Sequence, residues 1–160
     1  MKRITQAEIL NQVLHEEGCD VMYDHISRKI KGVYIDEPEA PYIVINPQLK
    51  ITEEVTTLAH EAGHHFTGLT GHTGRDEERA DRWAANYLIS PMDIVTATLK
   101  GARSYHDVAE MLHLPEQFIR NAIEILAIQY GQEIVLEQYR LHLLPVWVEC
   151  KETGQVWPEG

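Results

Sequence analysis

The sequence predicts an α+β fold: a mainly helical domain with a small β-sheet packed beside a histidine-rich helix. Three observations support this class. Apolar residues recur at helical spacing along most of the 160-residue chain. Two short segments, GVYID (32–36) and YIVINP (42–47), are rich in β-branched and aromatic residues, and we interpret them as neighbouring strands. The EPEAP between them contains the turn residues of a hairpin or loop.

Composition and charge narrow the class of protein further. A chain with 44% hydrophobic residues can bury the core of one globular domain. The net charge of -11 opposes binding to nucleic acid phosphates and to an anionic membrane. Cys19 and Cys150 belong to no CxxC pair, and no segment resembles a signal peptide or reaches transmembrane length. We therefore expect a cytoplasmic protein that binds neither nucleic acid nor membrane directly.

The first predicted helix spans residues 5–17 and ends at Gly18. Ile9 and Val13 are expected on its buried side, together with Leu10 and Leu14. We expect the whole chain, 1–160, to form a single domain. Its expected parts are a core of about residues 1–100, a helical part of about 101–144 and a short tail, 145–160.

The second predicted helix begins at Thr52, which can cap it, and runs to about Gly68. Glu53 and Glu54 in its first turn lie at the positive end of the helix dipole. One face is apolar at spacings of three and four, and its members are Val55, Leu58, Ala59, Ala62 and Phe66.

A third helix is predicted over about residues 76–89, ending before Ser90-Pro91. From residue 92 to 144 we expect further helices, broken at Gly101, near Leu114-Pro115 and at Gly131. A short extended piece, VWVEC, follows them.

The segment LAHEAGHHF contains the HExxH pattern, His60-Glu61-Ala62-Gly63-His64. Residues four apart on a helix project from one side, so both imidazoles can bind a single ion. Glu61 lies about 100 degrees round the helix from His60, so its carboxylate can face a water molecule without competing for the metal. Two half-buried histidines in an ordinary amphipathic helix would show the same pattern, which makes HExxH alone weak evidence.

The next helix adds two carboxylates at a specific spacing. Glu77 follows His64 by thirteen residues, and the intervening glycines allow the chain to turn back. It can complete the His2Glu set that zinc adopts in catalytic sites with one open position. Asp81, on the same helical face, can accept the outer N–H of a ligand histidine. The alternative is that Glu77 and Asp81 belong to a solvated acidic face with Asp76 and Glu78.

TLAHEAGHHFTG and DEERADRWAANYLISP together resemble the signature of the ImmA/IrrE metallopeptidase family over roughly residues 40–130. The resemblance implies a zincin-like core and a zinc-dependent peptidase, with one Zn2+ held by His60, His64 and Glu77 and with Glu61 as catalytic base. It also implies a protein substrate. Family members typically act as anti-repressors of prophages and integrative elements by cleaving a helix-turn-helix repressor, and others regulate stress responses.

A second oxyanion donor is usual in such sites, and the sequence does not choose among the candidates. They are His65, His72, Arg75, Arg82 and Tyr87. His65 points about 100 degrees away from its neighbour, which favours a packed or solvated side chain. His72 lies in a glycine-flanked loop.

The most strand-like segment consists of Tyr42, Ile43, Val44 and Ile45. We expect it at the edge of the sheet, where an extended substrate could pair with its backbone. Its continuous apolar character is also compatible with an interior strand that is paired on both sides.

A rival interpretation comes from residues 107–126, whose apolar spacing resembles a helix-turn-helix. Four acidic residues against Arg120 alone give this segment a net charge of -3, which opposes phosphate contacts. We expect a packing unit or a docking surface for substrate. A third possibility, a non-catalytic regulatory protein with structural zinc, would require a fourth protein ligand, and none is evident.

Overall fold

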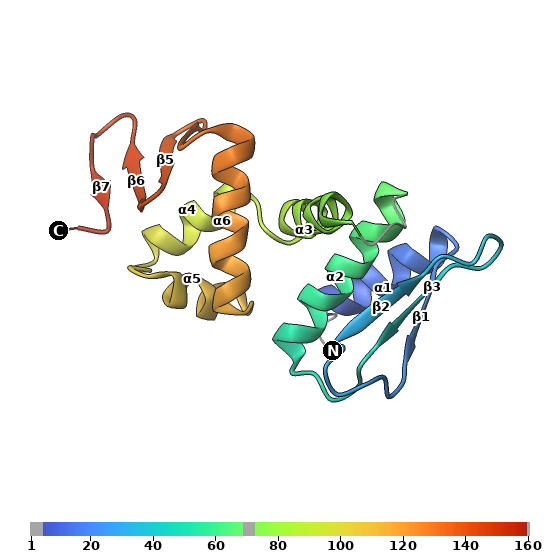
Figure 1. Ribbon diagram of the computed structural model, residues 1–160. Helices are drawn as coiled ribbons and strands as arrows, with labels where there is room; N and C mark the ends of the chain where they lie inside the picture. Colours follow the sequence, from blue (N-terminus) through green and yellow to red (C-terminus); the bar gives the residue numbers. More distant parts are fainter. Residues whose placement is uncertain (1–4, 69–72, 160) are drawn as a thin grey trace. The chain divides into compact units, whose positions relative to one another are not determined.

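The computed structural model describes residues 5–68 and 73–159. The chain divides into two compact units, Met1–Ala84 and Ala85–Gly160, which are shown in Figure 1. The expected α+β class is confirmed. The organisation as a single domain with a boundary near residue 100 stays a prediction.

The sheet of the first unit has the strand order β1-β3-β2. β1 (Asp20–Tyr23) runs parallel to β3 (Tyr42–Ile45), and β2 (Gly32–Ile35) runs antiparallel to β3. The predicted pairing of β2 with β3 is therefore confirmed. The edge position predicted for Tyr42, Ile43, Val44 and Ile45 is wrong, because β1 takes the second side of β3. β1 is not predicted from the sequence, because it is a four-residue strand with mostly exposed side chains.

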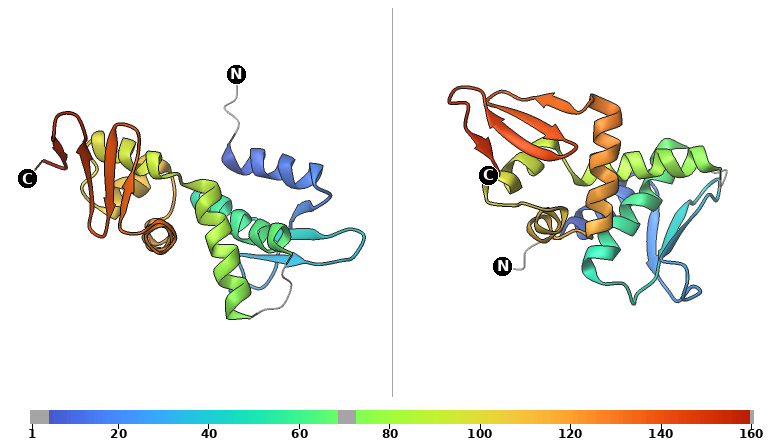
Figure 2. Two further views of the ribbon diagram at one scale, coloured as in Figure 1. Left: turned by 90° about the horizontal axis from the view of Figure 1, so that it is seen from above. Right: turned by 60° about the vertical axis from the view of Figure 1, so that its left-hand side comes forward.

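Two helices cover this sheet. α1 (Gln6–Glu16) packs on β1, and α2 (Ile51–Thr67) packs on β2, β3 and α1, as Figures 1 and 2 show. The core between them contains fully buried side chains of Leu10, Leu14, Ile43, Ile45 and Leu58. The core therefore fastens α2 to the sheet.

The helix predictions need three corrections in this unit. Ile9 is 47% exposed, and Ala7, Leu10 and Leu14 are the buried residues of α1. α2 begins one residue before Thr52, with Lys50 at the N-cap, so Thr52 does not cap it. Phe66 is 36% exposed instead of buried. Gly68 ends α2 in the left-handed region at φ 67°, which glycine adopts without strain.

The second unit combines three helices with a second sheet. The helices are α4 (Pro91–Leu99), α5 (Tyr105–Leu112) and α6 (Glu116–Tyr130). The sheet is antiparallel in chain order, with strands β4 (Glu133–Val135), β5 (Tyr139–Leu143), β6 (Val146–Cys150) and β7 (Val156–Trp157). The helix predicted over residues 132–144 is wrong. Leu141 and Leu143 face the core at a spacing of two, which is the period of a strand.

α5 and α6 form the pair of helices expected from the helix-turn-helix spacing. His113 turns the chain between them in the left-handed region, and Pro115 is the N-cap of α6, as predicted. Val108, Ala109, Leu114 and Ile119 are buried in the core of this unit. The pair is therefore part of the packing of the second unit.

Candidate metal centre

α2 carries two histidines on its side toward α3 (Gly74–Leu88). The apolar face of Val55, Leu58, Ala59 and Ala62 is buried and fixes the rotation of the helix about its axis. With that rotation, His60 and His64 lie one turn apart, and their ring centroids are 4.9 Å from each other. His64 is buried and His60 is half-buried.

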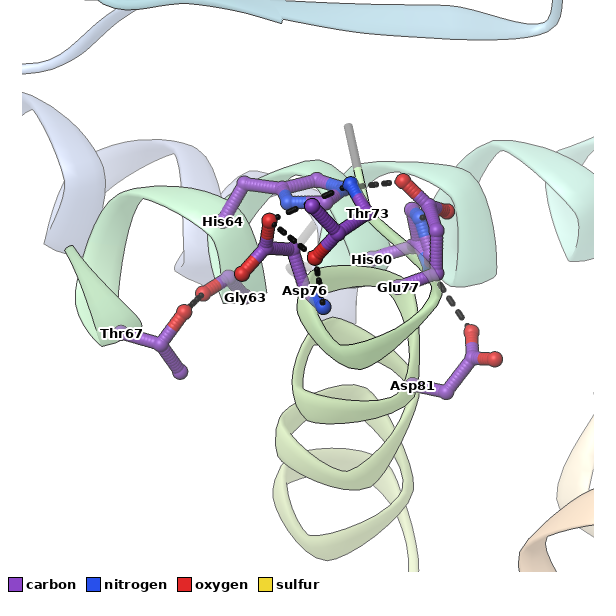
Figure 3. A network of polar contacts seen from close by, with 8 residues as sticks. All are labelled: His60, Gly63, His64, Thr67, Thr73, Asp76, Glu77 and Asp81. Carbon is purple, nitrogen blue, oxygen red and sulfur yellow. Dashed lines mark hydrogen bonds and ion pairs between the residues drawn. The ribbon is translucent and has the colours of Figure 1, made fainter. Parts of the chain in front are cut away.

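α3 brings a carboxylate to both histidines, as Figure 3 shows. The Glu77 carboxylate lies 3.1 Å from Nε2 of His60 through Oε2 and 3.3 Å from Nε2 of His64 through Oε1. One ligand atom from each of these three residues falls within 4.8 Å of the other two. The structure thus brings His60, His64 and Glu77 into one group that could hold a metal ion.

The chemistry of the donor set fits a zinc ion, which accepts imidazole nitrogen and carboxylate oxygen in catalytic sites. The N···O separations of 3.1 and 3.3 Å are ion-pair distances between Glu77 and the two histidines, and all three ligand atoms lie within 4.8 Å of one another. Three protein ligands leave a fourth position open for water or substrate, as catalytic sites require.

Asp81 lies one turn after Glu77 on α3 and contacts the other nitrogen of His60. Its Oδ1 is 2.8 Å from His60 Nδ1, which places the donated proton on Nδ1 and leaves Nε2 facing the Glu77 carboxylate. Burial lowers the pKa of His60, but the hydrogen bond to Asp81 and the charges of nearby carboxylates outweigh it and raise the pKa. A metal ion must therefore displace the proton from Nε2.

Asp76 corrects the expectation of a solvated acidic face on α3, because it is only 7% exposed. Its carboxylate accepts hydrogen bonds from the hydroxyl of Thr73 at 2.7 Å and from the Thr73 N–H at 3.2 Å. These bonds lower its pKa and tie down the beginning of α3. The charge of His64 also contributes to the lowered pKa of Asp76.

Glu61 lies on the side of α2 that faces β2. A Cβ placed on Gly32 would be 2.7 Å from Thr57 Cγ2 and 3.2 Å from Glu61 Cγ. The backbone of β2 therefore passes directly over the methylenes of Glu61. Only a residue without a side chain fits this approach unless Thr57 and Glu61 shift.

His65 belongs to the same side of α2. Its Nδ1 lies 3.2 Å from the hydroxyl of Tyr34 on β2. Burial and the charge of Asp36 raise the pKa of Tyr34 to about 12, so the hydroxyl keeps its proton. His65 is therefore a packed histidine bonded to the sheet, as favoured from the sequence.

The other candidate oxyanion donors are not tested by these contacts. Arg75 and Arg82 are exposed on α3. Tyr87 belongs to the second unit. His72 lies outside the described residues. Their roles stay predictions.

The fold and the site together define a class of protein. A helix bearing HExxH, covered by a sheet and crossed by a helix bearing a third ligand, is the arrangement of a zincin-like metallopeptidase. The chain belongs to the Peptidase_M78 family, described as the IrrE N-terminal-like domain, whose model matches residues 15–124. The resemblance to the ImmA/IrrE family is thereby confirmed. Membership of this family supports a metallopeptidase kind of function, with a protein as substrate.

Comparison with curated proteins finds no match. None of the helices in the described ranges is long and apolar enough to cross a membrane.

Proposed function

We propose that this protein is a zinc-dependent endopeptidase that cleaves a protein substrate at a specific site. The observation that carries the proposal is the convergence of His60, His64 and Glu77 within 4.8 Å, with Glu61 on the adjacent face of the same helix. Membership of a metallopeptidase family supports the same activity.

The residues divide the work of hydrolysis. His60, His64 and Glu77 would hold zinc, which would supply Lewis acidity for the hydrolysis of the peptide bond. Glu61 accepts a proton from the attacking water and returns it to the leaving amine. Asp81 keeps His60 in the tautomer that offers Nε2 to the metal.

We assign substrate pairing to β2 in place of β3. Asn46 N donates to Lys31 O at 2.9 Å. Lys31 and Asn46 are therefore a hydrogen-bonded pair of the antiparallel ladder that β2 and β3 continue. By the alternation of antiparallel pairing, the backbone groups of Gly32 and Tyr34 face away from β3. In the described sheet that side of β2 carries no further strand. An extended peptide paired there would lie beside Glu61.

This mode of pairing requires a locally unfolded substrate, because a helical segment cannot add to a strand edge. We propose that the natural target is a helix-turn-helix repressor or another transcription regulator, cut in a linker or a loosened terminus. Support for this target comes from the family resemblance. The protein would then act as an anti-repressor in the cytoplasm.

The test is incubation of the zinc-loaded protein with the repressor encoded beside it, with products identified by mass spectrometry. We expect a single cut that the Glu61→Gln protein does not make. An intact repressor after prolonged incubation would contradict the choice of target.

The α5–α6 pair leaves a DNA-binding function as the second candidate. Its segment, residues 107–126, carries four carboxylates against Arg120, and Arg120 is already bound to Glu116 at 2.7 Å. A gel-shift with random duplex at low salt separates the two functions. We expect no retention, whereas a DNA-binding protein would show retention that falls as salt rises.

A further inference from the structure

α2 and α3 touch backbone to backbone at Gly63 and Ala80. A Cβ built on Gly63 would lie 2.7 Å from the carbonyl oxygen of Ala80 and 2.8 Å from its Cα. Both residues are buried. The atoms that Gly63 meets belong to the backbone of α3, so no rotamer change can make room for a larger residue.

This contact lies among the candidate ligands on both helices. Gly63 stands between His60 and His64 in the sequence of α2, and Ala80 stands between Glu77 and Asp81 in α3. Figure 3 shows Gly63 on α2 beside α3, which runs away from α2 at a steep angle. The separation of the helices at this point therefore controls the separation of the ligand atoms.

A second contact restricts how α3 can respond. One turn further along each helix, Phe66 stacks on Trp83 with ring centroids 4.9 Å apart and an interplanar angle of 15°. Sliding α3 along α2 would break this stack. Moving α3 away from α2 would loosen the stack too, but the Cβ at position 63 would meet backbone atoms of α3, so a larger residue there pushes α3 outward together with Glu77 and Asp81.

The conformation of Gly63 does not explain why a glycine is there. Gly63 lies in the interior of α2 and has no positive φ, so alanine could adopt the same backbone angles. Alanine is also the better helix former. The close approach of α3 is the physical reason that remains.

We propose that Gly63 is a positioning residue that sets the distance between the histidines of α2 and the carboxylates of α3. The inference rests on the proposed metal-dependent function. An alanine must lengthen the 2.7 Å contact to the 3.4 Å of ordinary van der Waals contact, which displaces α3 by about 0.7 Å. Metal–ligand distances tolerate only about 0.2 Å. The displacement therefore opens the ligand group beyond what one ion can span without distortion.

The experiment compares Gly63→Ala with Gly74→Ala and the parent. Gly74 is also in a helix of this unit, and a Cβ there meets nothing within 4 Å. Zinc affinity is measured by competition with a chromogenic chelator, and Co2+ absorption spectra report the coordination geometry. We expect Gly63→Ala to bind zinc at least about tenfold more weakly and to show an altered cobalt spectrum. We expect Gly74→Ala to match the parent.

Circular dichroism of the metal-free proteins shows whether Gly63 places the candidate ligands or is needed for the chain to fold. We expect the metal-free Gly63→Ala protein to keep the helical signal of the parent. Equal zinc affinity and an unchanged cobalt spectrum would overturn the inference. A metal-free variant that is unfolded where the parent is folded would overturn it too, because Gly63 would then serve the fold.

Failure of the inference and failure of the proposed function give different results. A parent protein that binds no zinc refutes both. A parent that binds zinc but cleaves no protein refutes the endopeptidase proposal, and the difference in zinc affinity between Gly63→Ala and Gly74→Ala still decides the role of Gly63.

Discussion

The side of α2 that faces α3 and the side that faces β2 differ in whether they approach backbone atoms or side-chain atoms. On the side toward α3, the contact at Gly63 is with the backbone of Ala80, and His60 is bonded to Asp81 at 2.8 Å. On the side toward β2, a Cβ at Gly32 would meet only side-chain atoms, those of Thr57 and Glu61 on α2 and of Ile45 on β3.

The difference matches the two roles that we propose, metal binding on the side toward α3 and proton transfer by Glu61 on the side toward β2. Metal ligands must be held within a few tenths of an ångström, and backbone contact between two helices provides such rigidity. A proton-transferring carboxylate must move between water and leaving group, and a side-chain contact leaves it room. The following predictions test this contrast, from the largest expected effect to the smallest.

Removing a metal ligand should abolish both zinc binding and proteolysis. The parent is expected to bind about one zinc per chain, and His60→Ala and Glu77→Ala should lose it because two protein ligands cannot hold the ion at catalytic affinity. Metal analysis after dialysis measures the result. Glu78→Ala, an exposed neighbour on α3, is the control. Undiminished zinc in both ligand variants would remove the basis of the metal centre.

Glu61→Gln should abolish most of the proteolysis and leave zinc binding intact. The amide can neither take nor return a proton, so we expect proteolysis to fall by about 10²–10⁴-fold while zinc content stays at the parental level. Single-turnover cleavage assays with parallel zinc determination measure both properties. Activity near that of the parent would rule out Glu61 as the base.

Asp81→Ala should weaken metal binding without stopping the chemistry. Losing the carboxylate that orients His60 is expected to lower zinc affinity by about 10–100-fold, with near-normal activity at saturating zinc. Chelator competition and a zinc titration of activity distinguish the two effects. An affinity equal to that of the parent would place Asp81 on the solvated face of α3.

Tyr34→Pro tests the free edge of β2. Proline removes a backbone N–H that faces away from β3, so the pairing with β3 should survive while substrate pairing is lost. We expect a severalfold rise in KM with unchanged zinc affinity. Tyr34→Ala is the control, since it loses the same side chain but keeps the N–H. Identical KM values for the two variants would contradict pairing of substrate with β2.

Gly32→Ala should have the smallest effect, because its new methyl group meets side chains that can shift. We expect a modest loss of kcat with zinc affinity intact. The double variant Gly32→Ala, Thr57→Ser removes the Thr57 methyl carbon that lies 2.7 Å away and should recover part of kcat, because Ile45 Cδ1 at 3.0 Å and Glu61 Cγ at 3.2 Å still meet the new methyl group. No recovery in the double variant would show that the position of Glu61 does not depend on this contact.

Local patterns in the sequence were sufficient to predict several features. The helical period of α2 and the spacing of HExxH predicted which histidines share a face, because four residues span about one helical turn. The Glu77 and Asp81 spacing on α3 predicted two carboxylates on one face in the same way. The structure brings these groups together, and their roles as ligands and orienting residue stay predictions.

Predictions that depended on partners distant in the sequence were less successful. The segment 42–45 was expected at an edge, although continuous apolar strands are also typical of sheet interiors, and β1 makes it the central strand. Residues 132–144 were expected to be helical, yet strand pairing with β6 overrides that preference. In both segments the deciding hydrogen bonds come from other parts of the chain.

The sequence by itself therefore determined the chemical groups of the candidate site and the helices that carry them, because both depend on spacings within single helices. The tertiary structure alone decided how closely α3 approaches α2 at Gly63, which strand leaves its edge open beside Glu61, and that Asp76 is buried. These features depend on distances between elements, and such distances arise from packing and pairing that no local pattern specifies.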